Sequence, residues 1–155
     1  MPAVREVQIT DYFDHALPLM RENWAETGFG FEFNPSRERY ERLQASGLLF
    51  ALGAFDGEEL VGYSTAVVIE HLFNPARFTC ATDALFVRKS HRNGTLPGRL
   101  ILETERIAKK RGAHSIAWHT RAGTKFSEVL ARHGYEIVDV VVTRDFTEGD
   151  TPYGC

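Results

Sequence analysis

The 155-residue sequence contains little cysteine and no long apolar run. Its two cysteines, Cys80 and Cys155, are too few for a disulfide framework, and no cysteine or histidine spacing is typical of a metal site. No stretch approaches the roughly 18 apolar residues that a membrane-spanning helix requires, and the N-terminus lacks the apolar segment of a signal peptide. We therefore expect a cytoplasmic protein with no membrane partner and no metal.

A strong excess of one charge is also missing. The formal net charge is −3, so the overall balance does not indicate a nucleic-acid partner, and we expect none. The basic residues are nevertheless unevenly distributed. Eight lysines and arginines but only two glutamates lie between Arg88 and Arg111. This stretch either faces an anion or forms the solvated face of a helix.

The length and composition are those of one globular domain, with 43% apolar and 25% charged residues. We expect this domain to span residues 1–146 and a loose tail to follow over 147–155. Periodicity and turn signals predict a strand, two helices, three strands, a helix, a strand, a helix and a last strand. This order predicts an α/β fold (α+β mixed), in which a mixed sheet of about six strands has helices on both faces.

The predicted elements have recognisable boundaries. Pro18 should kink or split the first helix, and Asn34-Pro35 should begin the second. A strongly amphipathic helix is expected at Pro97–Arg111, and the last helix at Thr124–His133. The strands are expected at Val4–Ile9, Leu48–Phe55, Leu60–Ile69, Phe78–Val87, His114–Thr120 and Tyr135–Phe146.

The segment from Leu85 to Ile101 combines a strand end, a basic glycine-containing turn and the start of a helix. Free backbone N–H groups and the positive end of the helix dipole converge at such a turn, so it can cradle phosphate. The spacing is neither that of a dinucleotide-binding loop nor that of a P-loop. Because any β-α-β unit needs a loop here, a purely structural turn is the alternative.

Together with the order of elements, this segment resembles motif A of the GNAT superfamily of N-acetyltransferases. In that family a strand ending in Leu-x-Val leads into a turn of the form Arg/Gln-x-x-Gly-x-Gly/Ala and then into a helix that opens with Leu-Leu or Leu-Ile. The matching positions are Leu85, Val87, Arg92, Leu100 and Ile101. Thr124–Tyr135 resembles the family's last helix and the turn into its final strand.

The resemblance implies a site for acetyl-CoA. The amides of the turn would hold the pyrophosphate, the strand backbone would pair with the pantetheine arm, and a basic residue of the stretch 88–111 would reach the 3′-phosphate. The expected cofactor-binding residues are Leu85, Phe86, Val87, Arg88, Arg92, Asn93, Gly94, Thr95, Leu96, Gly98 and Arg99.

The sequence also departs from the family pattern. Thr95 and Pro97 stand where the family usually has glycines, and Leu130 stands where many members have a tyrosine that acts as general acid. Pro97 offers no N–H, although a shifted register through Gly94 and Gly98 would partly compensate. Such irregular turns resemble those of divergent members in tailed phages and prophages.

Asp83 is the first candidate for the residue that accepts a proton from the attacking amine. It lies two residues before Leu85, so it should share that residue's face of the strand. Family members with a catalytic glutamate carry it near this position. The alternative is that Asp83 forms a hydrogen bond to a neighbouring loop. Glu70, at the end of the preceding strand, and Glu32, in the aromatic loop Gly28–Phe33, are the next candidates.

These features predict an N-acetyltransferase that transfers the acetyl group of acetyl-CoA to an amine, by direct attack in a ternary complex. The acceptor is a small molecule or a protein, and the sequence leaves both this choice and a homodimer open. The alternative function is a GNAT-fold module with impaired catalysis that binds CoA or has a structural role, for example in a phage virion. The residues at Thr95, Pro97 and Leu130 favour that alternative.

Overall fold

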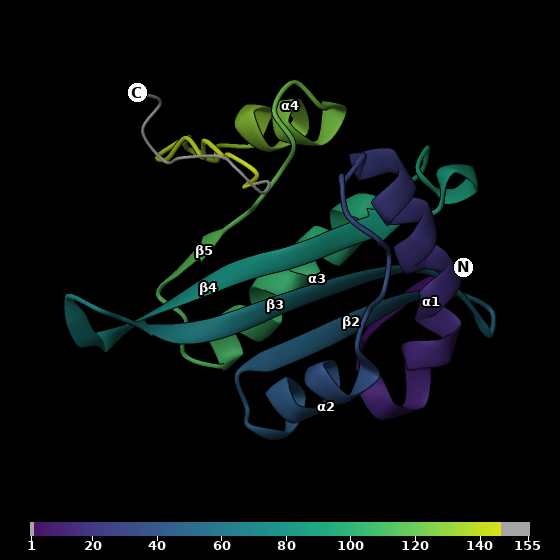
Figure 1. Ribbon diagram of the computed structural model, residues 1–155, viewed down its shortest axis with the longest axis horizontal. Coiled ribbons are helices and arrows are strands. Elements are labelled where there is room, and N and C mark those ends of the chain that lie inside the picture. The colour runs from purple at the N-terminus through teal and green to yellow at the C-terminus, as the bar shows by residue number, and fades with distance from the viewer. Residues whose placement is uncertain (1, 147–155) are drawn as a thin grey trace. The chain divides into compact units, whose positions relative to one another are not determined.

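The computed structural model describes residues 2–146, which divide into two compact units, 2–119 and 120–146 (Figure 1). The first unit contains a five-stranded sheet with the strand order β1-β2-β3-β4-β5. The strands are β1 (Ala3–Val7), β2 (Leu49–Asp56), β3 (Glu59–His71), β4 (Asn74–Val87) and β5 (Ser115–Ala117). The helices are α1 (Ile9–Thr27), α2 (Arg37–Ala45), α3 (Leu96–Lys110) and the short 3-10 helix η1 (Lys89–His91).

The sheet is mixed, as the order of elements predicts. Strands β1 to β4 pair antiparallel with their neighbours, and β5 pairs parallel with β4 after the crossover through α3. The hairpin between β2 and β3 turns at Gly57, whose φ of 61° suits glycine. Strands β3 and β4 are longer than expected, and only Leu72 and Phe73 separate them.

Helices cover both faces of the sheet, which confirms the expected layering (Figure 1). On one face, α1 and α2 pack on side chains that include Leu49, Tyr63 and Phe86. On the other face, α3 packs on a separate cluster that includes Phe50 and Val61. Each strand therefore contributes alternate side chains to two cores, as expected for strands buried on both faces.

Two details of the helices differ from the predictions. Pro18 does not split α1, which is continuous from Ile9 to Thr27. The hydrogen bond that Pro18 cannot donate would go to the carbonyl of Asp14, and both residues are exposed, so water can hydrate that carbonyl. Helix α2 begins at Arg37 rather than at Asn34-Pro35, because the Ser36 hydroxyl accepts the amide hydrogen of Arg39 and caps the helix.

The second unit contains α4 (Lys125–Arg132), whose amide at Ser127 is capped by the Thr124 hydroxyl. The predicted strand Tyr135–Phe146 is wrong, since residues 133–146 contain no strand, and the sheet has five strands rather than about six. Its valine content favours a strand, but a strand forms only when a neighbour completes its hydrogen bonds. The tail 147–155 lies outside the described residues. Within 2–146 no helix has the length and apolarity to span a membrane.

Candidate active site

The centre of the site is an irregularity in β4. Thr65 of β3 lies opposite Ala84, but the next residue, Ala66, lies opposite Thr82. Asp83 is therefore an extra residue without a partner in the register, which makes this a β-bulge. A bulge bends the strand and re-aims side chains, and such bulges are often found next to active sites.

The bulge changes which face of the sheet Asp83 occupies. Leu85 packs with the cluster under α3, whereas Ala84 packs on the side of α1 and α2. The Asp83 carboxylate accepts a hydrogen bond from the Thr65 hydroxyl at 2.9 Å, and Thr65 is the register partner of Ala84. Asp83 thus lies on the α2 face, and the prediction that it shares the face of Leu85 is wrong, because simple alternation fails across a bulge.

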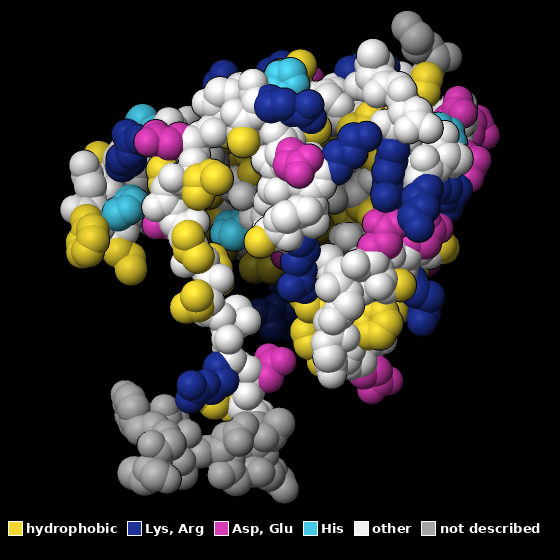
Figure 2. Space-filling view, turned by 90° about the horizontal axis from the view of Figure 1, so that it is seen from above, with side chains coloured by type: hydrophobic (Ala, Val, Ile, Leu, Met, Phe, Trp, Pro, Cys, Tyr) yellow, Lys and Arg dark blue, Asp and Glu magenta, His cyan; other side chains and the backbone are white. Residues whose placement is uncertain are grey.

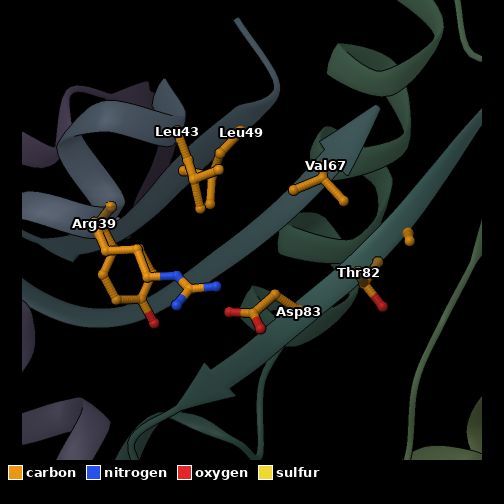
Figure 3. Close-up of a pocket in the computed structure, with 8 residues that line it drawn as sticks. Arg39, Leu43, Leu49, Val67, Thr82 and Asp83 are labelled. Atoms are coloured by element: carbon orange, nitrogen blue, oxygen red, sulfur yellow. The ribbon is translucent and has the colours of Figure 1, made fainter. Parts of the chain in front are cut away.

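A cavity of about 380 Å³ lies on this face, between α2 and the strands β2, β3 and β4 (Figure 3). Its lining residues are Arg39, Tyr40, Leu43, Leu49, Val67, Ala81, Thr82 and Asp83. The walls are mostly apolar, with one carboxylate and one guanidinium. A cavity of this size, with an apolar wall and a few polar groups, has the character of a small-molecule site.

Two tyrosines lie near Asp83. Burial raises the pKa of the Tyr63 phenol above its usual value, and the negative charge of Asp83 adds to this effect. The pKa of Tyr40 is also raised, again by burial first and by Asp83 second. The Asn23 amide donates a hydrogen bond of 3.0 Å to the Tyr63 hydroxyl. Both phenols therefore keep their protons at neutral pH, so Asp83 faces neutral rings rather than phenolates.

The edge of β4 beside Asp83 is open. In the described part of the chain, β5 pairs with β4 only over Thr79–Ala81. Beyond this point the His119 amide donates to the Thr82 hydroxyl at 3.0 Å, and among residues 2–146 no strand follows β4 along the same edge to Val87. The backbone from Asp83 to Val87 is therefore available for pairing with a ligand.

The turn that follows β4 leads into a helix end without a side-chain cap. Thr95 occupies the N-cap position of α3, but its hydroxyl makes no capping bond. The Arg99 amide donates to the Thr95 carbonyl and closes the first turn. The amides of Leu96 and Gly98 precede this bond, so they have no acceptor within the helix, and Pro97 has no N–H. The N-terminus of this 15-residue helix thus presents two free donors and a positive dipole end.

The basic side chains of the turn are less available than the sequence suggests. Arg92 donates to the Val87 carbonyl and, through its other nitrogen, to both carboxylate oxygens of Glu26 at 2.9 Å. Arg88 pairs with Glu59 at 2.5 Å, and the Lys89 ammonium lies 3.9 Å from Glu26. Figure 2 shows basic side chains directly beside acidic ones on the face that it draws. The charge of the turn is thus largely balanced within the protein.

The other expected cofactor residues are placed as follows. Phe86 and Val87 are buried in the two cores, and Leu85 is half-buried under α3. Asn93 and Gly94 lie in the exposed turn. The Arg99 guanidinium donates to the carbonyl of Pro2. The side chains of Phe86 and Val87 are packed and that of Arg99 is paired, so at these positions the backbone is the part available for binding.

The structure does not bring the remaining carboxylate candidates to Asp83. Glu70 lies near the hairpin end of β3, opposite Phe78, and alternation from Val68 places it on the α3 face. Glu32 is exposed in the loop between α1 and α2 and does not line the cavity. In that loop Phe29 stacks on Phe31 with ring centres 4.9 Å apart.

Other reactive groups lie away from the cavity. Cys80 is fully buried on the opposite face, and burial raises the pKa of its thiol to about 11. The thiol is therefore neutral and shielded from solvent. Within residues 2–146, no three His, Cys, Asp or Glu side chains form a group that could hold a metal ion.

Sequence reasoning missed three residues of the site. Arg39 and Tyr40 come from α2, and Thr65 comes from β3, so all three are distant from Asp83 along the chain. No local sequence pattern indicates that these residues belong to a site. Arg39 and Tyr40 are simply one exposed and one half-buried position of a short helix. Only the packing of α2 over the bulge reveals their role.

Comparison with known proteins identifies the family and the fold. The model of the acetyltransferase (GNAT) family matches residues 12–146. No curated protein sequence is similar to this chain. Among solved structures, a ribosomal-protein-alanine N-acetyltransferase from Brucella melitensis biovar Abortus 2308 is 17% identical, with a TM-score of 0.76 over 95% of this chain and 99% of that one.

Two further similar structures contain ligands. The aminoglycoside acetyltransferase meta-AAC0020 from an uncultured soil metagenomic sample, in complex with sisomicin, is 16% identical, with a TM-score of 0.74 over 94% of this chain and 95% of that one. AAC(6')-Iy in complex with the bisubstrate analogue CoA-S-monomethyl-acetylneamine is 18% identical, with a TM-score of 0.75 over 95% and 99%. At these identities the likeness concerns the fold.

Proposed function

Because the chain belongs to the GNAT acetyltransferase family, we propose that it is an N-acetyltransferase, which moves the acetyl group of acetyl-CoA to an amine bound in the Asp83 cavity. The observation that carries this proposal is the bulge in β4. It places a carboxylate in a mostly apolar cavity and leaves the strand edge beside it unpaired. A binding cavity, a proton acceptor and a free backbone edge thus meet at one point of the sheet.

The described residues fit acetyl-CoA through the backbone rather than through side chains. The amides of Leu96 and Gly98 at the uncapped start of α3 would bind the pyrophosphate. The open edge from Asp83 to Val87 would pair with the pantetheine arm. Arg92 would act indirectly, because its bonds to Val87 and Glu26 fix the end of β4 against α1. Acetyl-CoA itself supplies the reactive thioester.

Asp83 would take the proton that the amine loses. The amine nitrogen forms the bond to the acetyl carbon, the carbon–sulfur bond breaks with CoA leaving as the thiolate, and the proton from nitrogen goes to the Asp83 carboxylate. The Thr65 hydroxyl holds one carboxylate oxygen at 2.9 Å, so the other oxygen is left to accept the proton. A strand amide near Leu85–Val87 would stabilise the negative charge that develops on the carbonyl oxygen.

A second candidate function is CoA binding without turnover. It is favoured by Thr95 and Pro97 in the turn and by the pairing of the basic side chains with Glu26 and Glu59. This alternative and the proposed function both require acetyl-CoA to bind, but only the proposed function requires release of the CoA thiol.

The experiment measures both steps. Acetyl-CoA at 100 times its dissociation constant should stabilise the protein by about 2.7 kcal/mol, which raises the melting temperature by about 5–11 °C for a protein of this size. Thiol release is then followed across a panel of primary amines, with a reaction without amine as control. Stabilisation without thiol release would favour the alternative, and an unchanged melting temperature would contradict both.

A further inference from the structure

Helix α2 presents one arginine to the cavity without an acidic partner. Arg37 bonds to Glu41 at 2.7 Å and to Asp14 at 3.2 Å, and Arg42 lies 3.9 Å from Glu38. Arg39 lines the cavity, and within residues 2–146 its guanidinium makes no hydrogen bond or ion pair. The helix thus neutralises two of its three arginines and leaves the third to face the cavity.

Arg39 and Asp83 face each other across the cavity. Figure 3 shows the guanidinium and the carboxylate pointing toward one another from α2 and β4. They nevertheless form no ion pair, so their nitrogen and oxygen atoms are more than 4.0 Å apart. A ligand group can therefore lie between the two charges and contact both.

The wall between these charges is apolar. Leu43 comes from α2, Leu49 from β2 and Val67 from β3, and the half-buried Tyr40 ring borders the same space. Among these four side chains only Tyr40 carries a polar group, so they offer few hydrogen bonds to a hydroxyl-rich ligand. They suit an aliphatic or aromatic side chain, because its burial is favourable.

From this arrangement, and resting on the function proposed above, we propose that the acceptor is an α-amino acid with an apolar side chain. Its amine lies at Asp83, its carboxylate binds the Arg39 guanidinium, and its side chain packs on Leu43, Leu49 and Val67. An amino acid carries its two charges on neighbouring carbon atoms. The protein groups that bind these charges must therefore face each other, as Asp83 and Arg39 do. Guanidinium is well suited to carboxylate because it can donate two parallel hydrogen bonds.

The same arrangement disfavours other acceptors. A polycationic aminoglycoside would bring several ammonium groups into a cavity with a single carboxylate and an unpaired arginine, so like charges would repel. The N-terminus of a protein supplies the amine but not the carboxylate, so it would leave Arg39 without a partner. Comparing turnover of an amine with and without a carboxylate therefore distinguishes these classes of acceptor.

The test compares L-phenylalanine with phenethylamine, which lacks the carboxylate, and with L-phenylalaninamide, which replaces it by a neutral amide. In the thiol-release assay, kcat/KM should be about tenfold to a hundredfold higher for L-phenylalanine, which is the range of one charge-assisted hydrogen bond. Arg39→Gln should bring the ratio of kcat/KM for L-phenylalanine to that for phenethylamine close to one. Arg42→Gln, on the same helix but outside the cavity lining, is the matched control and should retain the preference.

Direct binding separates failure of this proposal from failure of the proposed function. Calorimetric titration of the protein with L-phenylalanine, with and without CoA, should give binding that Arg39→Gln weakens and Arg42→Gln does not. If no amine releases thiol, the proposed function fails and this titration alone decides the ligand. Equal turnover of all three probes, faster turnover of sisomicin than of L-phenylalanine, or binding that Arg39→Gln leaves unchanged would overturn the proposal.

Discussion

Replacing Asp83 by Asn tests the proposed chemistry at a single atom. The amide has nearly the shape of the carboxylate and its oxygen can still accept the hydrogen bond from the Thr65 hydroxyl, which spans 2.9 Å in the structure. It cannot accept a proton from the amine at neutral pH. This one substitution therefore separates the structural role of the Asp83 carboxylate from its role in proton transfer.

The two effects should differ widely in size. A charge-assisted hydrogen bond becomes a neutral one at an exposed side chain, which costs at most about 1 kcal/mol. For a chain of this length that corresponds to a fall of about 2–4 °C in the melting temperature. A positioned general base contributes about 10²–10⁴-fold to the rate, so kcat should fall by at least about tenfold.

Steady-state thiol release with the best amine of the panel gives kcat, and calorimetry gives the affinity for acetyl-CoA, which should not change. Thr65→Val is the matched control. It removes the same hydrogen bond but keeps the carboxylate, so it should lose less activity than Asp83→Asn.

Either of two results would refute the reasoning. Wild-type turnover by Asp83→Asn would show that the carboxylate accepts no proton in the rate-limiting step. A variant that fails to fold would show that the carboxylate at the bulge is required for structure, as the alternative in the sequence analysis holds.

Gly62→Ala should lower the free energy of unfolding by about 1–3 kcal/mol, because an added Cβ would lie 2.8 Å from the Phe86 carbonyl oxygen; a denaturation midpoint like that of the wild type would contradict this packing. Thr104→Val should cost about 1–3 kcal/mol, because the fully buried Ser64 hydroxyl loses its partner at 3.0 Å, and adding Ser64→Ala should recover part of the loss in the same assay. Burial raises the pKa of Cys80 from 9.0 to about 11, so the stability that the neutral thiol contributes is present below pH 9 and is lost as the pH rises to 11. Melting temperatures over this range should fall more for the wild type than for Cys80→Ala, and parallel curves would refute the assignment.

The sequence by itself determined the elements that depend on local chemistry. The amphipathic stripe of α3 and the glycine turn between β2 and β3 lie where periodicity and turn residues predicted them. The crossover from Phe78 to Thr120 is long enough for a parallel β-α-β unit, and in the structure β5 pairs parallel with β4. The resemblance of the turn to motif A likewise needed no coordinates, and it agrees with the family match over residues 12–146.

Predictions from local sequence were wrong or incomplete where the structure depends on a partner from a distant part of the chain. The valine-rich segment Tyr135–Phe146 has strand propensity, but no strand is present there in the described residues. The arginine and lysine side chains near the turn read as an anion site, yet Glu22, Glu26 and Glu59 pair with them from distant parts of the chain. Neither result could be derived from the composition of the segment itself.

Only the tertiary structure decided the geometry of the candidate site. Simple alternation along β4 predicts that Asp83 shares the face of Leu85. Because of the bulge, Asp83 instead lies on the opposite face, under α2. A bulge arises from the register between two strands, and no property of Asp83 or its neighbours in sequence encodes it. For the same reason Arg39 could be assigned no role until α2 was packed over the bulge: charge complementarity depends on distances through space, and the sequence gives only distances along the chain.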